Sequence, residues 1–540
     1  MWTLLLSLAH AAKPVDLVVV GDVLTDLGPV AGAVVVHDAT IRGIEKKAPR
    51  RASQVLQADL ITAGLVDAHA HPASLGRALV TLDLVGTASQ EEVLERVGGT
   101  VEEGTGWLIG RGWDQNDWPD TTWPTAAALD TVTGDRPTVL YRVDGHALWA
   151  NTAALVASGV QPEWPDPPGG QALRGADGAP AGVLIDEAMA WIQKPEVPLE
   201  EQRRRLLLAL DAIAATGLTG VHDQGASDVT LQLYEELAVA DQLPIKITAY
   251  AWIDTSAAER ARTEGGWGTG NFEVRGVKAA ADGALGSRGA ELSRDYADQP
   301  GHRGLPGTDS DDLASWATDL LGQGLQLTVH AIGDAAIGRT LDAFAVARQA
   351  WPEREGLPLR VEHAQITNPT DVGRFAELGV VASMQPTHAT SDMPWVLDRV
   401  GADREAWGYT WRSFLDAGVT LAFGSDFPVE AVAPNLGLWS ATTRMHLDGT
   451  PQGGWFPEQS LTLSEAVRAF SVGAHEARGE TGPVGLVAGA PADLTLWRVE
   501  ERHGHVWLVP TATLVDGVVV WQETARPDGG LLPVVEPEGR

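Results

Sequence analysis

Eight short apolar segments bounded by turn residues lie between residues 64 and 428, and they constrain the fold more than any other feature of the chain. Their sequences are GLVDAHAH, GLTGVHDQG, PIKITAYAWI, EVRGVKAAAD, LQLTVHAIGD, PLRVEHAQI, GVVASMQP and TLAFGSDFP. Helical patterns at 311–324, 334–351 and 370–379 fall between the later segments. This alternation of strand and helix is typical of a parallel (β/α)8 TIM barrel, so we predict an α/β fold of that kind.

The two ends of the chain carry a different pattern, with short β-type runs separated by Gly and Asp turns. VDLVVVGDVLTDLG and AGAVVVHDATIRGIE lie near the N-terminus, and APADLTLWRV and ATLVDGVVVWQ lie near the C-terminus. Because ends of matching character often pair, we expect residues 15–62 and 479–540 to form one β domain beside a barrel that spans 63–478.

The spacing of the barrel segments is uneven in one place. Residues 72–216, about 145 in number, separate the first segment from the second, which is far more than one helix and two loops need. We expect an inserted subdomain at about 85–210 that hangs over the C-terminal mouth of the barrel. It contains GRGWDQNDWPDTTWP and YRVDGHALWANTAAL, which together are rich in Trp, Asp and His. A purely structural excursion is the alternative.

Composition limits the partners and the chemistry. The 540 residues include 39 Lys and Arg against 72 Asp and Glu, a formal net charge of −33. Such acidity argues against nucleic acid or an anionic membrane surface as a partner. The chain has no Cys, so His and carboxylates are the metal ligands that remain. The apolar runs are too short for a membrane span. We expect a small-molecule substrate and leave a homodimer open.

The first barrel segment, GLVDAHAH, places three polar side chains at alternate positions: Asp67, His69 and His71. Successive strand side chains point to opposite faces, so these three share one face. Two imidazoles are costly to bury without a partner, and a metal ion removes that cost because neutral imidazole is the commonest metal ligand in proteins. The alternative is a pair of hydrogen-bonded histidines at a strand end.

Other residues of ligand type stand in later barrel segments. Lys278 belongs to the fourth segment, His330 and His363 to the fifth and sixth, and Asp426 to the eighth. Active sites of such barrels lie at the C-terminal ends of the strands. Taken singly, each histidine is explained as a satisfied core residue and Asp426 as a turn residue. Together with the two histidines of the first segment they indicate a metal site.

Lys278 requires an argument of its own, because an ammonium group beside metal cations would be repelled. It stands in the middle of RGVKAAADG, where apolar residues are expected. A neutral lysine amine can add carbon dioxide and become a carbamate, an anionic ligand able to bridge two metal ions. An ion pair with Asp282 is the competing account.

Several motifs, taken in order, resemble one known family. DAHAH, VKAAADGALGSRGA, TVHAIGDAAI, VEHAQI, ASMQPTHATSD and LAFGSDFPVE are similar to the amidohydrolase superfamily, in the branch called amidohydrolase family 3 or YtcJ-like proteins. RVDGHALWANTAAL and GGWFPEQSLTLSEAVRAF fit the same branch, so the resemblance covers nearly all of residues 15–522. It implies a distorted (β/α)8 barrel with a β-sandwich domain built from both chain ends.

The resemblance also implies a metal centre. In the family pattern two histidines hold one divalent ion, two hold another, a carboxylated lysine bridges them, and an aspartate is both ligand and proton carrier. We therefore expect two divalent metal ions, with Zn2+ as the first choice, and a carbon dioxide-derived carbamate on the lysine. The matching residues here are, in that order, His69 and His71, His330 and His363, Lys278, and Asp426.

The expected reaction follows from such a site. A zinc ion lowers the pKa of bound water from 15.7 towards ~7, which makes a hydroxide available at neutral pH. Asp426 would take its proton as it attacks a carbonyl carbon and pass that proton to the leaving nitrogen. We expect a metal-dependent hydrolase of amide-type C–N bonds, for example N-acyl or N-formyl bonds. A mononuclear deaminase-like enzyme, which has no need of Lys278, and a catalytically silent binding scaffold are the alternatives.

Four further residues are candidates for substrate contacts. His146, His222 and His388 lie in DGHALW, VHDQG and QPTHATSD, near the expected mouth, where each would hold the tetrahedral oxyanion or serve a structural role. Arg288 lies in the loop beyond the fourth barrel segment. It would bind an anionic substrate group or else brace the loop.

Residues 1–14 precede the globular pattern. Trp2 to Leu8 is a short apolar run, and Ala9-His10-Ala11 resembles a small-residue cleavage site, but no basic residue precedes it. A signal peptide at 1–11, which would export the protein to the periplasm, and an N-terminal extension of a cytoplasmic protein are both open.

Overall fold

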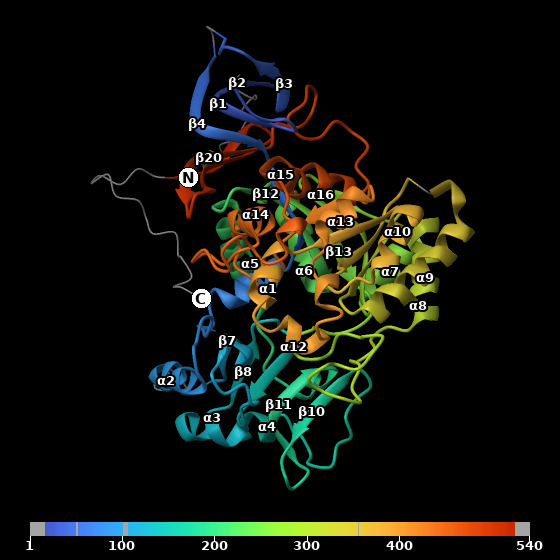
Figure 1. Cartoon of the computed structure of the whole chain (residues 1–540). Coiled ribbons are helices and arrows are strands. Elements are labelled where there is room, and N and C mark those ends of the chain that lie inside the picture. The colour runs from blue at the N-terminus through green and yellow to red at the C-terminus, as the bar shows by residue number, and fades with distance from the viewer. Residues whose placement is uncertain (1–16, 50–51, 101–105, 355, 524–540) are drawn as a thin grey trace, which may run out of the picture.

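The computed structural model describes residues 17–49, 52–100, 106–354 and 356–523, which form three parts (Figure 1). A β domain from the chain ends lies at one end of the molecule, the barrel in the middle, and an inserted subdomain at the other end. The export hypothesis concerns residues 1–14, which lie outside the described residues. None of the helices in the described ranges is long and apolar enough to cross a membrane.

Eight parallel strands form the barrel, and each overlaps one of the eight segments predicted from the sequence. Each strand is hydrogen-bonded to the next, so the sheet confirms the predicted α/β barrel. In spatial order they are β5 (Leu65–Ala70), β12 (Leu218–Ala226), β13 (Lys246–Trp252), β15 (Phe272–Ala280), β16 (Gln326–Ala331), β17 (Leu359–His363), β18 (Val380–Met384) and β19 (Leu421–Phe423). The short β14 (Gly268–Thr269) pairs with β15.

The loop after β19 joins the last strand of the barrel to the first. Asp426 N donates to His69 O at 2.8 Å, and His71 N donates to Phe427 O at 3.0 Å. Gly424 permits this close approach, because a Cβ at that position would lie 2.5 Å from His69 N. The seam therefore places both histidines of the first segment beside Asp426.

Helices cover the outside of the barrel. The predicted helical patterns correspond to α8 (Ser310–Gly322), α9 (Asp334–Ala350) and α10 (Pro369–Leu378). α9 buries Ile337, Leu341 and Phe344, which recur at helical spacing, so its apolar face packs on the strands. Further helices of the barrel are α1 (Pro72–Ala78), α5 (Leu199–Ala214), α6 (Asp228–Val239), α7 (Ser256–Glu264), α11 (Pro386–Asp392), α12 (Val396–Val400), α13 (Trp411–Asp416), α14 (Pro434–Thr443), α15 (Leu463–Phe470) and α16 (Val472–Ala477).

Both chain ends contribute strands to one seven-stranded sheet, which confirms the shared β-sandwich domain. The order is β22 (Val518–Gln522), β21 (His505–Val515), β20 (Leu494–Arg502), β4 (Gln54–Ala63), β1 (Leu17–Thr25), β2 (Gly28–His37) and β3 (Thr40–Glu45). The two ends meet where β4 pairs antiparallel with β20. Leu17, Val34 and Leu494 belong to the apolar cluster of this domain. Residues from both ends of the chain therefore share one core.

The segment between β5 and β12 forms a separate six-stranded sheet, so the inserted subdomain follows the first barrel strand as predicted. Its strands are β10 (Gly170–Arg174), β11 (Pro180–Asp186), β9 (Ala147–Ala150), β8 (Thr138–Arg142), β7 (Leu108–Trp113) and β6 (Leu82–Asp83), and its helices are α2 (Gln90–Thr100), α3 (Ala126–Thr133) and α4 (Thr152–Ala157). Trp113 and Trp149 are fully buried in its own apolar cluster. The domain boundaries drawn from the sequence stay a prediction.

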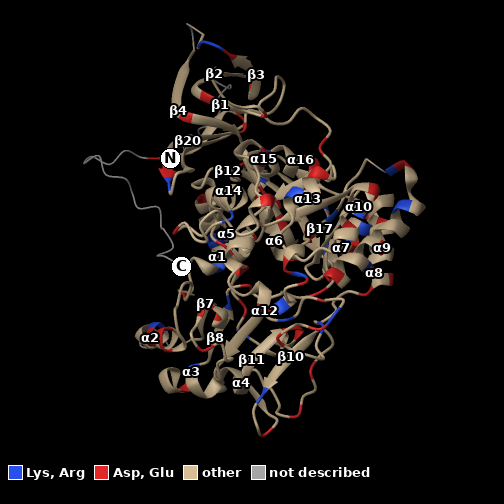
Figure 2. Cartoon of the chain, in the orientation of Figure 1, with Lys and Arg blue, Asp and Glu red and all other residues tan. Residues whose placement is uncertain are grey.

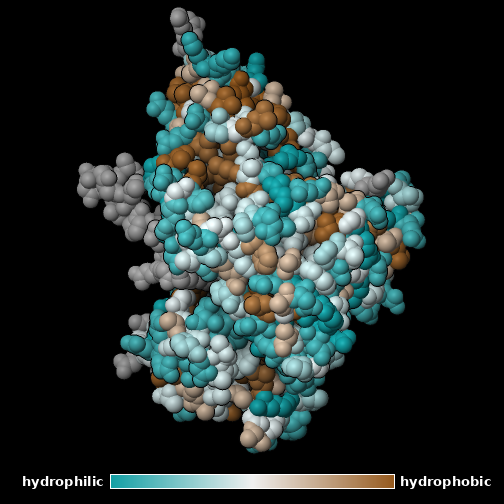
Figure 3. Space-filling view, viewed as in Figure 1, coloured by the Kyte–Doolittle hydropathy of each residue, from teal (hydrophilic) through white to brown (hydrophobic). Residues whose placement is uncertain are grey.

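The molecular surface differs between the parts. Charged side chains of both signs are spread over all three parts in the view of Figure 2. Figure 3 shows the most apolar surface of this view over β1–β4, where Leu27, Val30 and Val55 are exposed. That surface lies at the opposite end of the molecule from the inserted subdomain. The homodimer that the sequence left open stays a prediction.

Candidate metal centre and active site

The residues of ligand type predicted from the sequence lie together at the carboxyl ends of the barrel strands. The ring centroid of His363 is 4.6 Å from that of His69 and 4.5 Å from that of His330. The His71 ring follows at 5.4 Å from the His69 ring. The amine of Lys278 is buried near the same cluster, where burial and the charge of this amine lower the pKa of His69. Four strands or the residues directly after them therefore contribute to one site.

Asp426 is the centre of two groups of possible metal ligands. Its Oδ1 lies 2.9 Å from His71 Nε2 and 3.5 Å from His69 Nε2, and its Oδ2 lies 3.9 Å from His388 Nε2. In the first group the ligand atoms of His69, His71 and Asp426 lie within 4.8 Å of one another, and in the second those of His363, His388 and Asp426 do. Imidazole nitrogens with a carboxylate oxygen are donors that suit a zinc-like divalent ion.

Two neighbours that the sequence analysis missed orient the ligand histidines. His69 Nδ1 lies 2.7 Å from Glu362 Oε2, and His363 Nδ1 lies 2.8 Å from Gln385 Oε1. Because both oxygens accept, each Nδ1 carries the proton and each Nε2 presents a lone pair, as in metal sites whose ligands are fixed by a second hydrogen bond. Glu362 belongs to the motif VEHAQI and Gln385 to the motif ASMQPTHATSD, so the sequence signal for both residues is their place beside candidate ligands.

A buried arginine forms an ion pair with Glu362. Arg360 is fully buried, and its Nε lies 2.9 Å from Glu362 Oε1. Its Nη2 donates to Ala68 O at 2.8 Å, and its Nη1 donates to His222 Nδ1 at 2.9 Å. His222, a candidate for substrate contact, therefore lies in the barrel interior against Arg360 and is not among the residues that line the cavity.

Burial and charge set the protonation states of the ligand groups. Burial holds the pKa values of His69, His330 and His363 well below the usual range, so these rings are neutral and able to bind a metal ion. Burial alone would raise the pKa of Asp426, but the neighbouring His69 and His71 rings hold it below its usual range. Asp426 is therefore an ionised carboxylate.

Lys278 is buried in β15 without a hydrogen bond or ion pair to any of the described residues. Asp282, its alternative partner, instead accepts from the backbone N–H of Ile332 at 3.0 Å. Burial lowers the pKa of Lys278 to about 8, although the nearby carboxylates of Glu362 and Asp426 act in the opposite direction. A larger share of the amine is therefore uncharged near neutral pH than in an exposed lysine.

The backbone at the site is strained. His363 has φ +71° and Asp426 has φ +61°, in the left-handed region that residues other than glycine rarely adopt. On a regular strand His363 would point to the face opposite Glu362. The left-handed turn at the end of β17 lets both side chains serve the same site, and strain of this kind is concentrated at functional sites.

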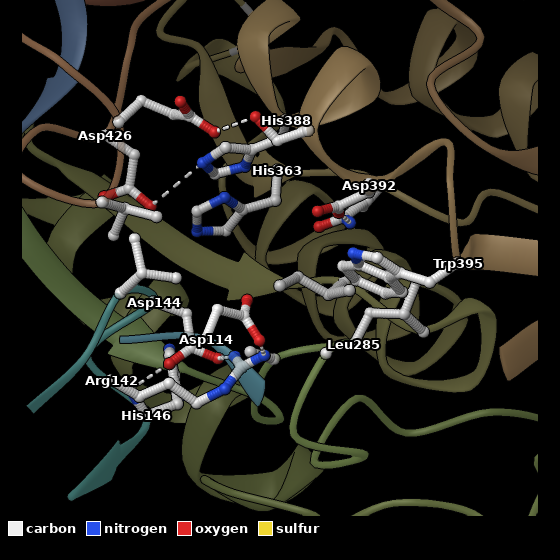
Figure 4. A pocket seen from close by; sticks show the side chains of 18 of the residues that line it. Asp114, Arg142, Asp144, His146, Leu285, His363, His388, Asp392, Trp395 and Asp426 are labelled. Carbon is white, nitrogen blue, oxygen red and sulfur yellow. Dashed lines mark hydrogen bonds and ion pairs between the residues drawn. The ribbon is translucent and has the colours of Figure 1, made fainter. Parts of the chain in front are cut away.

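A cavity at the mouth is lined by both the barrel and the inserted subdomain. Figure 4 shows His363, His388 and Asp426 on one side of it. Across from them Figure 4 places residues of the inserted subdomain, Asp114, Arg142, Asp144 and His146. Apolar Leu285 and Trp395 also line the cavity. The inserted subdomain therefore covers the mouth, as expected from the sequence.

Two arginines of the inserted subdomain stabilise its position at the mouth, Arg142 by ion pairs within the subdomain and Arg111 by a hydrogen bond to the barrel. Arg142 is fully buried and forms ion pairs with Asp114 and Asp144. Arg111 of β7 donates to Pro428 O, in the loop that carries Asp426. The loop that carries Asp426 is therefore hydrogen-bonded directly to the inserted subdomain.

The four candidates for substrate contact separate into two pairs. His146 and His388 line the cavity, whereas His222 and Arg288 do not. Arg288 Nη2 donates to Asp298 Oδ2 at 2.8 Å, which favours the bracing role over a substrate contact. The roles of His146 and His388 stay a prediction that the geometry permits.

The fold and the site together define a (β/α)8 barrel protein with a candidate His–Asp metal centre at its mouth. Residues 56–521 match the model of the amidohydrolase family, and the chain belongs to that family. The resemblance drawn from the motifs is thereby confirmed, and the chain is a member of a hydrolase family.

Similar proteins share nearly the whole chain. YtcJ of Bacillus subtilis (strain 168) is 29% identical over 520 residues, which cover 91% of this chain and 96% of YtcJ. The N-substituted formamide deformylase of Arthrobacter pascens is 28% identical over 523 residues, covering 91% of this chain and 93% of the deformylase. An uncharacterized metal-dependent hydrolase from Pyrococcus horikoshii OT3 has a crystal structure with TM-score 0.70 at 24% identity, covering 88% of this chain and 96% of that one, and so has the same fold.

Proposed function

We propose that this protein is a metal-dependent hydrolase that cleaves amide-type C–N bonds of a small molecule, with N-formyl and N-acyl compounds as substrates. The observation that carries the proposal is the position of Asp426, which lies inside the cavity and within ligand distance of two groups of histidines. Membership of the amidohydrolase family supports hydrolysis. The similarity to a protein named for deformylation of N-substituted formamides supports the bond class.

We assign two divalent ions to this centre, with Zn2+ as the first choice, because two groups of possible ligands share Asp426. His69 and His71 would hold one ion and His330 and His363 the other, with Asp426 as a shared ligand. His388 is a further ligand candidate, because its ligand atom groups with those of His363 and Asp426, whereas His330 is in neither group of the described residues and its Nε2 lies 3.4 Å from Gly283 O. A carbamate on Lys278 would bridge the pair. Bound ions of this type lower the pKa of water and so supply a hydroxide near neutral pH.

Asp426 is the proton carrier in this proposal. It takes a proton as the oxygen of the nucleophile bonds to the carbonyl carbon, and it returns that proton to the nitrogen as the C–N bond breaks. The products are an amine and a carboxylic acid, which is formic acid for an N-formyl substrate. Glu362 keeps the His69 ring oriented, and Leu285 and Trp395 would contact the substituent on nitrogen and exclude water.

Lys278 also bears on the two alternative functions. A deaminase-like enzyme with a single ion has no need of a lysine in the metal centre, yet this chain buries the Lys278 amine beside the ligands. A silent scaffold would be expected to lose ligands, and this chain keeps all six that the family pattern requires. Both observations favour the hydrolase with two ions.

The proposal is tested on zinc-loaded, desalted protein. Elemental analysis should find close to two ions per chain, and a panel of N-substituted formamides and N-acyl amines should release amine and acid in equal amounts. His69→Ala should lose both metal and activity. Loaded protein that hydrolyses no member of the panel would contradict the proposal. Release of ammonia from amino-substituted heterocycles by protein with one ion would support the deaminase-like alternative.

A further inference from the structure

A histidine–aspartate pair of the inserted subdomain faces the ligand groups across the cavity. His146 lies between β8 and β9 and lines the cavity. Its ring centroid is 5.3 Å from that of His330, and its Nδ1 lies 2.6 Å from Asp186 Oδ1. With Nδ1 bound to Asp186, Nε2 is the ring nitrogen available to a molecule in the cavity.

Asp186 is held in an unusual environment at the end of β11. Its φ is +48°, in the left-handed region, and its Oδ2 is buried without a hydrogen-bond partner among the described residues. That oxygen lies between two glycines of the loop after β15. A Cβ on Gly283 would lie 2.7 Å from it, and a Cβ on Gly289 would lie 2.8 Å from it. The carboxylate fits there only because both neighbours lack side chains.

Each of these features costs stability. A non-glycine residue at positive φ is strained, and a buried carboxylate oxygen without a donor loses its hydration without replacement. The hydrogen bond that the Asp186 carboxylate retains is the one from His146 Nδ1. The strained residue and the two glycines therefore have one common effect, which is to fix the orientation of the His146 ring in the cavity.

We propose that His146 is a catalytic residue whose Nε2 donates a hydrogen bond to the substrate carbonyl oxygen as the carbonyl carbon becomes tetrahedral, and that Asp186 is its positioning residue. The inference rests on the proposed function. The carbonyl oxygen gains negative charge during the attack, and a donor fixed beforehand stabilises that charge without reorganising. Because Nδ1 donates to Asp186, Nε2 carries a proton to donate only in the charged ring, and the carboxylate on Nδ1 stabilises that charged ring.

Turnover provides the first test, on an N-substituted formamide that the wild type hydrolyses. His146→Ala should lower kcat by ~10² to 10³ with unchanged metal content. Asp186→Asn should lower kcat about tenfold in the wild type and have no further effect in the His146→Ala background, because it acts through His146. Asp130→Asn is the matched control: Asp130 accepts from Thr152 N at 2.8 Å inside the same subdomain, away from the cavity, and should leave kcat unchanged.

Calorimetric binding of benzylphosphinate to zinc-loaded protein tests the same contact without turnover, since its tetrahedral anion has the shape expected after attack. His146→Ala should weaken this binding at least tenfold, and Asp130→Asn should not. If His146→Ala fails to fold, His146→Gln is measured instead, and it should retain part of the binding because it keeps a polar side chain.

The outcomes separate the inference from the proposed function. If the wild type hydrolyses no formamide but binds the phosphinate through His146, formamides are not the substrates, whereas the contact of His146 with a tetrahedral anion stands. If formamides are hydrolysed with a kcat that His146→Ala leaves unchanged, the function stands and the inference is overturned. Phosphinate binding that is absent from the wild type, or equal in wild type and His146→Ala, also overturns the inference. If the two substitutions lower kcat independently, so that their effects multiply in the His146→Ala/Asp186→Asn double variant, Asp186 does not act through His146.

Discussion

Replacement of Lys278 tests the bridging role that the proposed two-ion site requires. Lys278→Ala removes a buried amine from β15, and we expect the protein to lose both metal ions and its activity together. Lys278→Arg should fail as well, because a guanidinium group keeps its charge and cannot form a carbamate. Short carboxylates such as acetate should restore part of the metal content of Lys278→Ala, because they replace the missing bridge.

The pKa of Lys278 determines how much of its amine is uncharged and able to add carbon dioxide. Burial lowers this pKa from 10.5 to about 8. At pH 7 the uncharged fraction of the amine rises from roughly 0.03% at the ordinary pKa to roughly 10%, about a 300-fold gain in the form that adds carbon dioxide. Because the amine loses its proton as the pH rises through the pKa, metal-free protein given Zn2+ at the same concentration of dissolved carbon dioxide should recover about fivefold faster at pH 8 than at pH 7.

The assay combines elemental analysis with carbon NMR of metal-free protein reconstituted with 13C-bicarbonate and Zn2+. A carbamate carbon signal should be present in the wild type and absent from both Lys278 variants. Lys246→Ala is the matched control: Lys246 Nζ lies 2.8 Å from Asp493 Oδ2, in an ion pair between the barrel and the β domain. It should lose stability but keep its metal ions. A bare amine in metal-loaded wild type, or Lys278→Ala with two ions and full turnover, would refute the reasoning.

Three other substitutions test the site. Asp426→Asn should lower turnover by ~10² to 10⁴, and unchanged kcat with intact metal content would assign the proton carrier elsewhere. Glu362→Gln should weaken metal affinity about 10- to 100-fold in competition with a chelator, because it weakens the bond to His69 Nδ1 and leaves the buried charge of Arg360 unpaired; wild-type affinity would contradict this. Gly424→Ala places a Cβ 2.5 Å from His69 N, so urea unfolding should show a loss of about 1–3 kcal/mol, and unaltered stability would mean that the barrel seam can relax.

The sequence predicted the barrel well because its strands are short apolar runs with turn residues on either side. The spacing of Asp67, His69 and His71 carried information on the site, since a two-residue period places side chains on one face. In the structure His69 does meet the other ligand histidines, while Asp67 serves the seam, where its carboxylate accepts from Ser425 Oγ at 2.6 Å. The members of this pattern therefore have different roles.

The partners of the ligand residues could not be predicted in the same way. Arg360 and Glu362 alternate in an apolar strand, which is a local sign of a buried charged pair, but the bonds that explain them reach other strands. Asp186 carries no local sign at all, because its partner His146 is 40 residues away in the chain. The left-handed turn at His363 is likewise invisible in the sequence, since it is imposed by tertiary contacts that outweigh a local preference.

The structure divides the proposed chemistry between two parts of the chain. The proposed metal ligands come from the barrel, whereas the opposite wall of the cavity comes from the inserted subdomain. The two parts meet at the loop after β15, where a Cβ on Gly286 would lie 3.2 Å from Arg142 Nη1, and at the loop after β19, where Arg111 donates to Pro428 O. The first of these loops follows the strand that contains Lys278, and the second contains Asp426. Because loops can vary on one barrel without loss of the fold, changes in the cover can alter the accepted substituent while the metal chemistry is retained.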